Sequence, residues 1–328
     1  MNLIFPSRND KTKLEVFNEN IGNKKIIENR VIYEYETEFD ESFVKEFLEK
    51  NKIMEGYEEY LSRKIADKLK NRNSKIMGIL NSTPDSFYSG SRVSNFSNID
   101  RIIDEKPDII DIGGESTRPG SEPVPVEKEI ARLEPVIEYV KSSTDIPVSI
   151  DTRNPETLKK MLKYDLDYIN DISGFENKKM ISLAVENNLK CVVMHMRGVP
   201  KNMQQFTSYD DMFYEINKSF YKKTGEMVKF GVKPENIILD PGVGFAKDFA
   251  GNIEIIKSPW SFFIGFETLF GTSRKGFLGN ITSSKIEERL GATIATSIYL
   301  NKNGVDILRV HDPKQNSDAI KTFNYLEN

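Results

Sequence analysis

The sequence predicts an α/β fold: a (β/α)8 TIM barrel with a small α+β extension at its N-terminus. Three observations indicate it. Eight short apolar runs recur after residue 75, amphipathic segments lie between them, and residues 76–328 match the ~250 residues of one barrel. We assign residues 1–73 to the extension, whose role the sequence does not reveal, and residues 74–328 to the barrel. A doubly wound parallel sheet is the competing topology.

The apolar runs are predicted to be parallel strands because most are continuously apolar over four or five residues, as strands covered on both faces are. Ile109-Ile110-Asp111-Ile112 is an example. The predicted strands are 76–81, 108–114, 147–152, 167–173, 190–196, 236–242, 267–273 and 307–312.

Apolar residues at steps of three or four predict the intervening helices. In 126–143, for example, Val126, Ile130 and Leu133 share one face. The other predicted helices are 155–164, 178–188, 208–230, 285–302 and 313–326. In the extension, weak alternation predicts a strand within 28–38, and 40–51 and 54–72 read as helical.

Composition excludes several classes of protein. A single cysteine excludes an intrachain disulfide and a cysteine-rich zinc site, and two histidines exclude a histidine-rich metal site. A net charge of −4 argues against a nucleic-acid partner, and no apolar run approaches the ~18 residues that span a membrane. We therefore expect no nucleic acid, no membrane and a cytoplasmic location.

Polar residues follow every predicted strand, at the end of the barrel where active sites of this fold lie. These residues are Asn81, Asp111, Asp151, Asn170 with Asp171, His195, Asp240, Ser273-Arg274-Lys275 and Arg309 to Asp312. One such residue alone is more often a cap or a turn former. Eight of eight strands ending this way indicate a site at one rim.

Two groups at this rim suggest chemistry. Arg309 and His311 lie two apart on one strand, next to Asn81 on the first, and suit a phosphate or pyrophosphate, with the Asn81 amide oxygen available to a metal ion. The carboxylates of Asp151 and Asp240, with Asn170, suit a flat heterocycle rich in N–H donors, and Lys275 could donate to a ring carbonyl or nitrogen. An acid/base pair for hydrolysis, or a two-carboxylate metal site, remains open.

Long loops rich in glycine, serine and proline, 82–90 and 113–120, follow the first two strands and are lid candidates. At this point the chain resembles the dihydropteroate synthase family. The motifs, in order through all eight strands, are 77–87 (MGILNSTPDSF), 111–120 (DIGGESTRPG), 149–152 (SIDT), 169–171 (IND), 194–198 (MHMRG) with 203–204 (MQ), 240–245 (DPGVGF), 271–275 (GTSRK) and 309–312 (RVHD).

The resemblance implies condensation of 7,8-dihydropterin-6-methyl pyrophosphate with p-aminobenzoate, releasing pyrophosphate, in folate biosynthesis, and hence a sulfonamide target. The implied substrate-binding residues are Asn81, Phe87, Asp111, Thr117, Arg118, Pro119, Asp151, Asn170, Met194, Asp240, Phe245, Lys275, Arg309 and His311. The implied catalytic residues are Asp85, Asp151, Lys275, Arg309 and His311, with Mg²⁺ near Asn81. An SN1-like departure of pyrophosphate is expected, and a homodimer through the last helices.

The chain departs from the family pattern at three places. Gly276 replaces a serine whose hydroxyl can approach the p-aminobenzoate carboxylate, which leaves a related arylamine open. Segments 246–252 (AKDFAGN) and 87–91 (FYSGS) differ around the site. The alternatives are a non-catalytic pterin-binding paralogue, a pterin-dependent methyltransferase-like barrel, and a barrel enzyme acting on another phosphorylated ligand.

Overall fold

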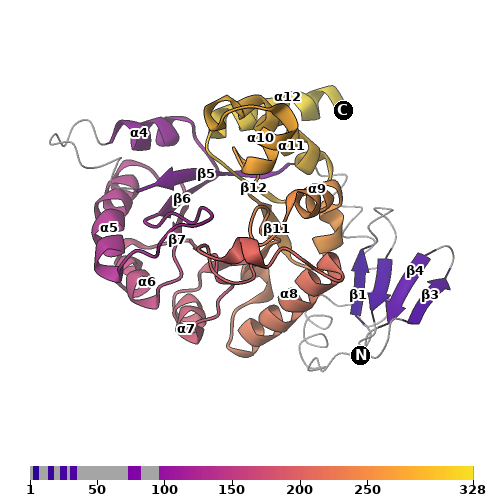
Figure 1. Cartoon of the computed structure of the whole chain (residues 1–328). Helices are drawn as coiled ribbons and strands as arrows, with labels where there is room; N and C mark the ends of the chain where they lie inside the picture. Colours follow the sequence, from indigo (N-terminus) through magenta and orange to yellow (C-terminus); the bar gives the residue numbers. More distant parts are fainter. Residues whose placement is uncertain are drawn as a thin grey trace.

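A computed structural model of the chain describes residues 3–6, 14–17, 23–27, 30–34, 73–82 and 96–327. Eight parallel strands form a closed barrel with helices around its outside (Figure 1). Each strand pairs with the next along the chain, and the last pairs with the first, Leu308 opposite Ile76. The (β/α)8 barrel is therefore confirmed, and the open doubly wound sheet is wrong.

All eight predicted strands are present; β5 is one residue longer than predicted, and the other seven are shorter by up to three residues at an end. The strands are β5 (Lys75–Asn81), β6 (Ile109–Gly113), β7 (Val148–Asp151), β8 (Tyr168–Asp171), β9 (Lys190–Met194), β10 (Ile237–Asp240), β11 (Glu267–Phe270) and β12 (Ile307–Val310).

The predicted helices are also present. The α-helices described are α4 (Ser97–Asp104), α5 (Val126–Ser143), α6 (Pro155–Met161), α7 (Lys178–Glu186), α8 (Met212–Lys229), α9 (Phe249–Lys257), α10 (Gly276–Thr282), α11 (Leu290–Lys302) and α12 (Pro313–Glu327). Sequence periodicity did not find α4, α9 and α10, although α6 and α7, which are equally short, were predicted.

Alternate residues of each strand face the two sides of the barrel wall. Outward-facing side chains such as Ile110, Ile150 and Leu308 join the large core beneath the helices. The inward-facing ones form a separate apolar layer inside the barrel: Met77, Ile109, Tyr168, Val192, Ile238, Leu269 and Ile307. Burial on both faces explains why the strands read as continuous apolar runs.

The first part of the chain contributes two antiparallel pairs. β1 (Leu3–Pro6) pairs with β2 (Leu14–Phe17), and β3 (Asn23–Ile27) pairs with β4 (Arg30–Glu34). β4 lies within the strand predicted for 28–38. The helices predicted for 40–51 and 54–72 lie outside the described residues, so the α+β extension stays a prediction.

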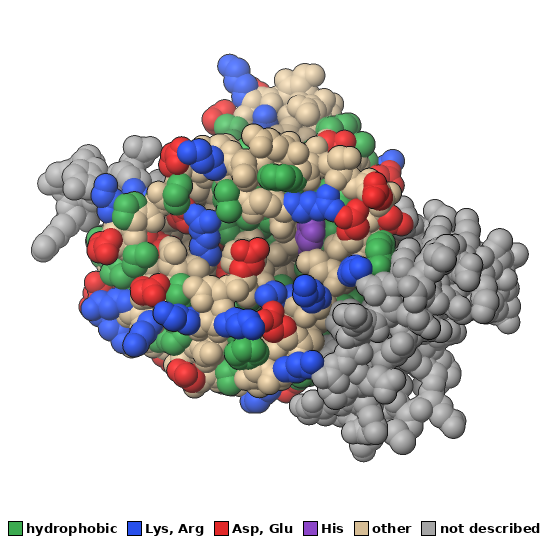
Figure 2. All heavy atoms as spheres, turned by 60° about the horizontal axis from the view of Figure 1, so that its bottom comes forward, with side chains coloured by type: hydrophobic (Ala, Val, Ile, Leu, Met, Phe, Trp, Pro, Cys, Tyr) green, Lys and Arg blue, Asp and Glu red, His purple; other side chains and the backbone are tan. Residues whose placement is uncertain are grey.

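None of the helices that the structure describes is both long and apolar enough to cross a bilayer. On the face shown in Figure 2, basic and acidic side chains of the described residues are interspersed rather than gathered by sign. A nucleic-acid-binding face instead concentrates Lys and Arg.

Candidate active site

Just beyond the apolar layer, toward the carboxyl ends of the strands, the inside of the barrel becomes polar. Residues two positions further along the same strands share the inward face. On six strands they are Asp111, Asp151, Asn170, Met194, Asp240 and Arg309, all in register with inward-facing neighbours. The predicted cluster at the carboxyl ends of the strands is thus assembled by the fold.

The guanidinium of Arg309 lies between two carboxylates. Its Nε donates to Asp111 Oδ2 at 2.6 Å and its Nη2 donates to Asp151 Oδ2 at 2.7 Å. Asn170 Nδ2 also donates to Asp111 Oδ2, at 3.2 Å, whereas Asp111 Oδ1 is buried without a hydrogen bond among the described residues. One cation therefore serves two buried acids, and one acceptor oxygen is left over.

Burial raises the pKa of Asp151; the neighbouring Arg309 opposes this shift, and the Asp111 carboxylate adds to it. The charged form of Arg309 is stabilised by both acids, which raise its pKa against the effect of burial. A site with surplus carboxylate suits a ligand that brings N–H donors.

A second pair of charges lies across the barrel, on β10 and at the start of α10. Burial raises the pKa of Asp240, while Lys275 opposes that shift, and Asp240 Oδ1 accepts from the Gly242 backbone N–H at 2.8 Å. Burial lowers the pKa of Lys275 to about 8. The Lys275 ammonium donates to Val243 O and lies 4.6 Å from the centre of the Phe245 ring. The structure therefore brings Asp240, Phe245 and Lys275 together as predicted.

His311, directly after β12, lies against Ser273. Ser273 Oγ accepts from the His311 backbone N–H at 3.2 Å and lies 3.0 Å from His311 Nδ1. Burial, with Arg309 and Arg274 nearby, lowers the pKa of His311 to about 4, so its ring is neutral at pH 7. We infer that the serine hydroxyl donates to Nδ1, which leaves the proton on Nε2. Asn81, on the neighbouring strand β5, has an exposed side chain.

The predicted lid loops are described only in part. Asp85 and Phe87 lie outside the described residues. Thr117, Arg118 and Pro119 precede Gly120, whose backbone N–H donates to Pro200 O at 3.0 Å. The loop after β6 therefore reaches the loop after β9.

Two residues at strand ends do not belong to the site. Asp171 points outward, where its carboxylate accepts from the backbone N–H groups of Ser173 and Phe175 at 2.8 and 3.1 Å. His195 is also buried outside the barrel, with its Nδ1 3.2 Å from Lys247 Nζ. Both are structural groups that the sequence placed beside the functional ones, because neighbours in a strand face opposite ways.

Sequence reasoning missed two supporting groups. Glu129 on α5 is fully buried and accepts from Thr152 Oγ1, Asn154 Nδ2 and Thr157 Oγ1 at 2.6 to 2.7 Å, which holds the segment after β7. The second group is Lys247, which is only 2% exposed and whose ammonium donates to the backbone carbonyl of Phe245. A charged residue at an otherwise apolar helix position is the signal that could have found Glu129.

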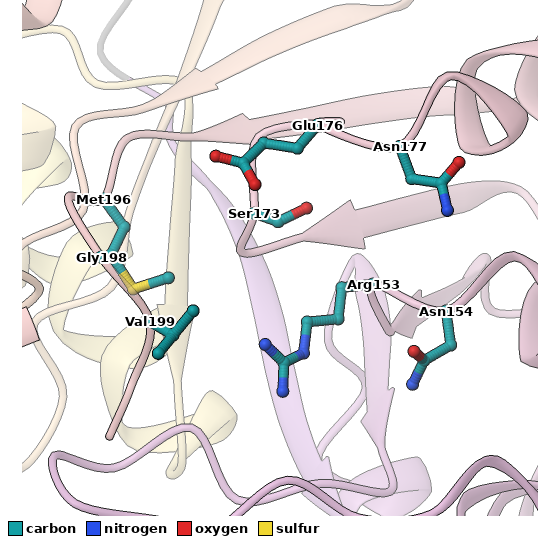
Figure 3. Close-up of a pocket in the computed structure, with 8 residues that line it drawn as sticks. All are labelled: Arg153, Asn154, Ser173, Glu176, Asn177, Met196, Gly198 and Val199. Atoms are coloured by element: carbon teal, nitrogen blue, oxygen red, sulfur yellow. The ribbon is translucent and has the colours of Figure 1, made fainter. Parts of the chain in front are cut away.

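A cavity of about 250 Å³ lies beside the mouth (Figure 3). The segments that follow β7, β8 and β9 line it with Arg153, Asn154, Ser173, Glu176, Asn177, Met196, Gly198 and Val199. Arg153 is paired with Glu115, Nη2 to Oε1 at 3.0 Å. The cavity is thus bounded by the loops that follow β7, β8 and β9, whereas Asp151, Asn170 and Met194 on these strands do not line it.

The chain matches a known protein family and its characterised members. Residues 77–311 match the model of a family described as pterin binding enzyme. The chain is 38% identical to the dihydropteroate synthase of Synechocystis over 263 residues, 78% of this chain and 91% of that protein. The chain belongs to the dihydropteroate synthase family.

Solved structures of this family agree. A Xanthomonas albilineans dihydropteroate synthase with 4-aminobenzoic acid superposes with a TM-score of 0.72 at 31% identity, over 78% of this chain and 93% of that one. A Clostridium difficile dihydropteroate synthase, solved in the presence of pteroic acid, gives 0.71 at 38% identity, over 77% and 96%. The resemblance drawn from the motifs is confirmed, and the activity is that of a transferase of folate biosynthesis, a dihydropteroate synthase.

Proposed function

We propose that this barrel condenses 7,8-dihydropterin-6-methyl pyrophosphate with p-aminobenzoate through the residues gathered at its mouth. The observation that supports this assignment of roles is the shared guanidinium of Arg309, with an unpaired acceptor oxygen on Asp111 beside it. A pterin edge carries several N–H donors and one carbonyl, and this site offers surplus acceptors with one opposing ammonium.

In this proposal Asp111, Asp151, Asn170 and Asp240 hold the donor edge of the pterin, with Met194 beside the ring. Lys275 donates to the ring carbonyl or nitrogen from the opposite side. The buried acceptors are already oriented by Arg309 and Gly242, so little side-chain freedom is lost on binding.

The pyrophosphate is assigned to Arg309, His311 and Asn81. A neutral His311 with its proton on Nε2 acts as a hydrogen-bond donor, and Arg309 supplies the positive charge. Donors fixed before the reaction stabilise charge that develops on a leaving group.

We propose Mg²⁺ as the metal ion, because the oxygen ligands available at the mouth fit it. No cluster of three or more His, Cys, Asp or Glu that could hold a metal occurs among the described residues. Mg²⁺ in phosphate chemistry is commonly held by one or two protein oxygens together with the substrate phosphates, and the exposed Asn81 amide offers one such oxygen. When bound, the ion would neutralise charge on the pyrophosphate.

The proposed reaction is SN1-like. The bond from the pterin methylene carbon to the pyrophosphate oxygen breaks, the dihydropterin delocalises the resulting cation, and the arylamine nitrogen then bonds to that carbon and loses a proton. Asp151, and Asp85 from the first loop, would stabilise the cation. Because the amine attacks unactivated, no nucleophilic side chain is needed.

The arylamine pocket is assigned to Phe245 and Lys275, with Phe87 and the loop residues Thr117, Arg118 and Pro119. The Xanthomonas albilineans protein binds 4-aminobenzoic acid, which supports p-aminobenzoate as the amine. Gly276 leaves this wall without a side chain, so a related arylamine remains the alternative.

A homodimer and a cytoplasmic location complete the proposal. Ile281 on α10, Tyr299 on α11 and Leu326 on α12 are exposed large side chains, which supports self-association through the last helices. The one cysteine, Cys191, is buried and unpaired, which fits a reducing compartment.

The test is pyrophosphate release from the dihydropterin pyrophosphate, with Mg²⁺, with and without p-aminobenzoate, detecting the pteroate by mass. Amine-dependent release with coupled product is expected. Pterin binding without product would point to a different amine, and no pterin binding would overturn the proposal.

A further inference from the structure

A second lysine lies behind the arylamine wall. The loop between β10 and α9, residues 241–248, contains Lys247 as its last residue but one, and the side chain of Lys247 is buried in the protein. Within the described part of the chain, its ammonium donates to neutral acceptors: Phe245 O at 2.8 Å, His195 Nδ1 at 3.2 Å and His195 O at 3.4 Å. A buried ammonium whose hydrogen-bond acceptors are all neutral is costly.

The loop is wrapped closely around this ammonium. Gly242 has φ +69°, and a Cβ there would collide with His195 O and lie 3.5 Å from Lys247 Nζ. Gly244 has φ +84° and donates its N–H to Asn252 Oδ1. Ala246, with φ +49°, accepts from Tyr209 Oη at 2.9 Å. Three residues in the left-handed region within five positions make a conformation that contacts from outside the loop must maintain.

The environment of His195 determines its charge and which of its ring nitrogens carries the proton. Burial, with Lys247 and Arg197 nearby, lowers the pKa of His195 well below its ordinary value, so the ring is neutral. An ammonium only donates, so Nδ1 must accept and the proton must lie on Nε2. The Lys247–His195 pair therefore joins the loop after β10 to the end of β9.

The other side of the same loop forms the proposed arylamine wall. Lys275 donates to Val243 O and lies over the Phe245 ring, and a Cβ on Gly244 would lie 3.1 Å from Lys275 Cδ. The two lysines thus bond to alternate carbonyls of one short loop, Lys275 to Val243 from the site and Lys247 to Phe245 from behind.

We propose that Lys247, held by His195, is a positioning residue that sets the Phe245–Lys275 wall against which the arylamine binds. This inference rests on the proposed function, since it concerns the second substrate. It predicts a selective effect: the arylamine wall is built from this loop and Lys275, whereas most of the proposed pterin ligands, Asp111, Asp151, Asn170 and Asp240, lie on the strands.

The charge on Lys247 adds a pH-dependent consequence. Burial lowers the pKa of Lys247 to about 7; Asp240 opposes the shift, and Lys275 and Arg197 add to it. His195, which also faces the nitrogen, stays neutral. Above pH 7 the amine loses one of its donors, so the wall should loosen as pH rises.

The test measures the two substrates separately in Lys247→Met, Lys247→Arg and His195→Phe. Lys257→Met, which removes an exposed lysine of α9, is the matched control. We expect Lys247→Met to raise the KM for p-aminobenzoate about tenfold or more, with less than a twofold change in calorimetric Kd for the pterin pyrophosphate, and the control to match wild type. Equal losses for both substrates, or no difference from Lys257→Met, would overturn the proposal.

Two further measurements sharpen the test, and the second, a pH profile, keeps the proposal testable even if Lys247→Met folds poorly. The His195→Phe and Lys247→Met double variant should be no worse than Lys247→Met alone, because the two residues act as one unit. The KM for p-aminobenzoate in wild type should rise from pH 7, and Lys247→Arg should retain only the later step of Lys275 near pH 8. Additive effects or identical profiles would count against it. If no variant or wild type binds the pterin pyrophosphate, the proposed function has failed instead.

Discussion

Buried acids near the strand ends differ according to the side of the barrel wall on which they lie. Outside, Asp171 and Glu129 are saturated by donors from nearby backbone and side chains. Inside, Asp111 and Asp151 share one guanidinium, and an oxygen of Asp111 has no partner among the described residues. The outer acids fasten loops to helices, whereas the inner ones keep acceptors free. A buried carboxylate whose oxygens all accept hydrogen bonds is structural, whereas one with an unpaired oxygen can still bind a ligand.

The largest expected effect comes from removing the inner cation. Arg309→Ala leaves two buried carboxylates without their shared partner and removes a donor to the pyrophosphate. Turnover should fall about 10²- to 10³-fold, as for other preorganised charge stabilisers. Steady-state kinetics measure this, with Arg101→Ala on the exposed face of α4 as the control. Unchanged rates would remove Arg309 from the mechanism.

An outer acid should behave in the opposite way. Glu129→Gln keeps the shape but replaces an acceptor oxygen by an amide donor, so at least one of its three donors loses its partner. We expect a loss of about 2 to 3 kcal/mol in the free energy of unfolding, measured with urea. The folded variant should bind the pterin pyrophosphate within a few-fold of wild type. A pterin-binding defect without lost stability would contradict the comparison.

His311 tests whether a donor or a charge matters at the mouth. His311→Gln preserves a hydrogen-bond donor and should lose less than about tenfold in turnover, whereas His311→Leu should lose on the order of tenfold to a hundredfold. Equal losses in both variants would favour a charged imidazole instead.

The same residue makes stability pH-dependent. Its folded pKa of about 4 lies below the ordinary value of 6.5, so between these values the unfolded chain binds a proton that the native state does not. Stability should therefore fall as pH drops from 6.5 to 4. His311→Gln should show a shallower fall in urea unfolding across this window, and an identical slope would exclude His311 as its source.

The smallest effect is expected at Gly276, beside the arylamine wall. A Cβ there meets nothing within 4 Å, and the residue does not have a positive φ. Gly276→Ser should therefore fold normally, with a stability gain of about 0.4 to 1 kcal/mol from the restricted unfolded chain. If p-aminobenzoate is the native amine, its KM should fall a few-fold. A raised KM would indicate a different amine.

Much of the fold could be predicted because its signals are local. Strands buried on both faces read as apolar runs, and α5 begins and ends at the predicted residues, 126 and 143. The short helix α10 was missed because two of its seven residues are glycine, a poor helix former. The candidate site could be predicted as a set of strand-end residues, and the motifs indicated the family. Asp85, Phe87 and the helices within residues 40–72 lie outside the described residues, so those predictions stand untested.

The sequence by itself determined the barrel, the family and the rim of polar residues, because these depend on periodicity and on motifs within short stretches of chain. Only the tertiary structure decided the partners. Closure of the barrel places Arg309 against Asp111, 198 positions away in the chain, and turns Asn170 inward but Asp171 outward. It also buries Lys247 against His195. Hydrogen bonds and charges act over a few ångströms in space, and the order of residues along the chain does not specify those distances.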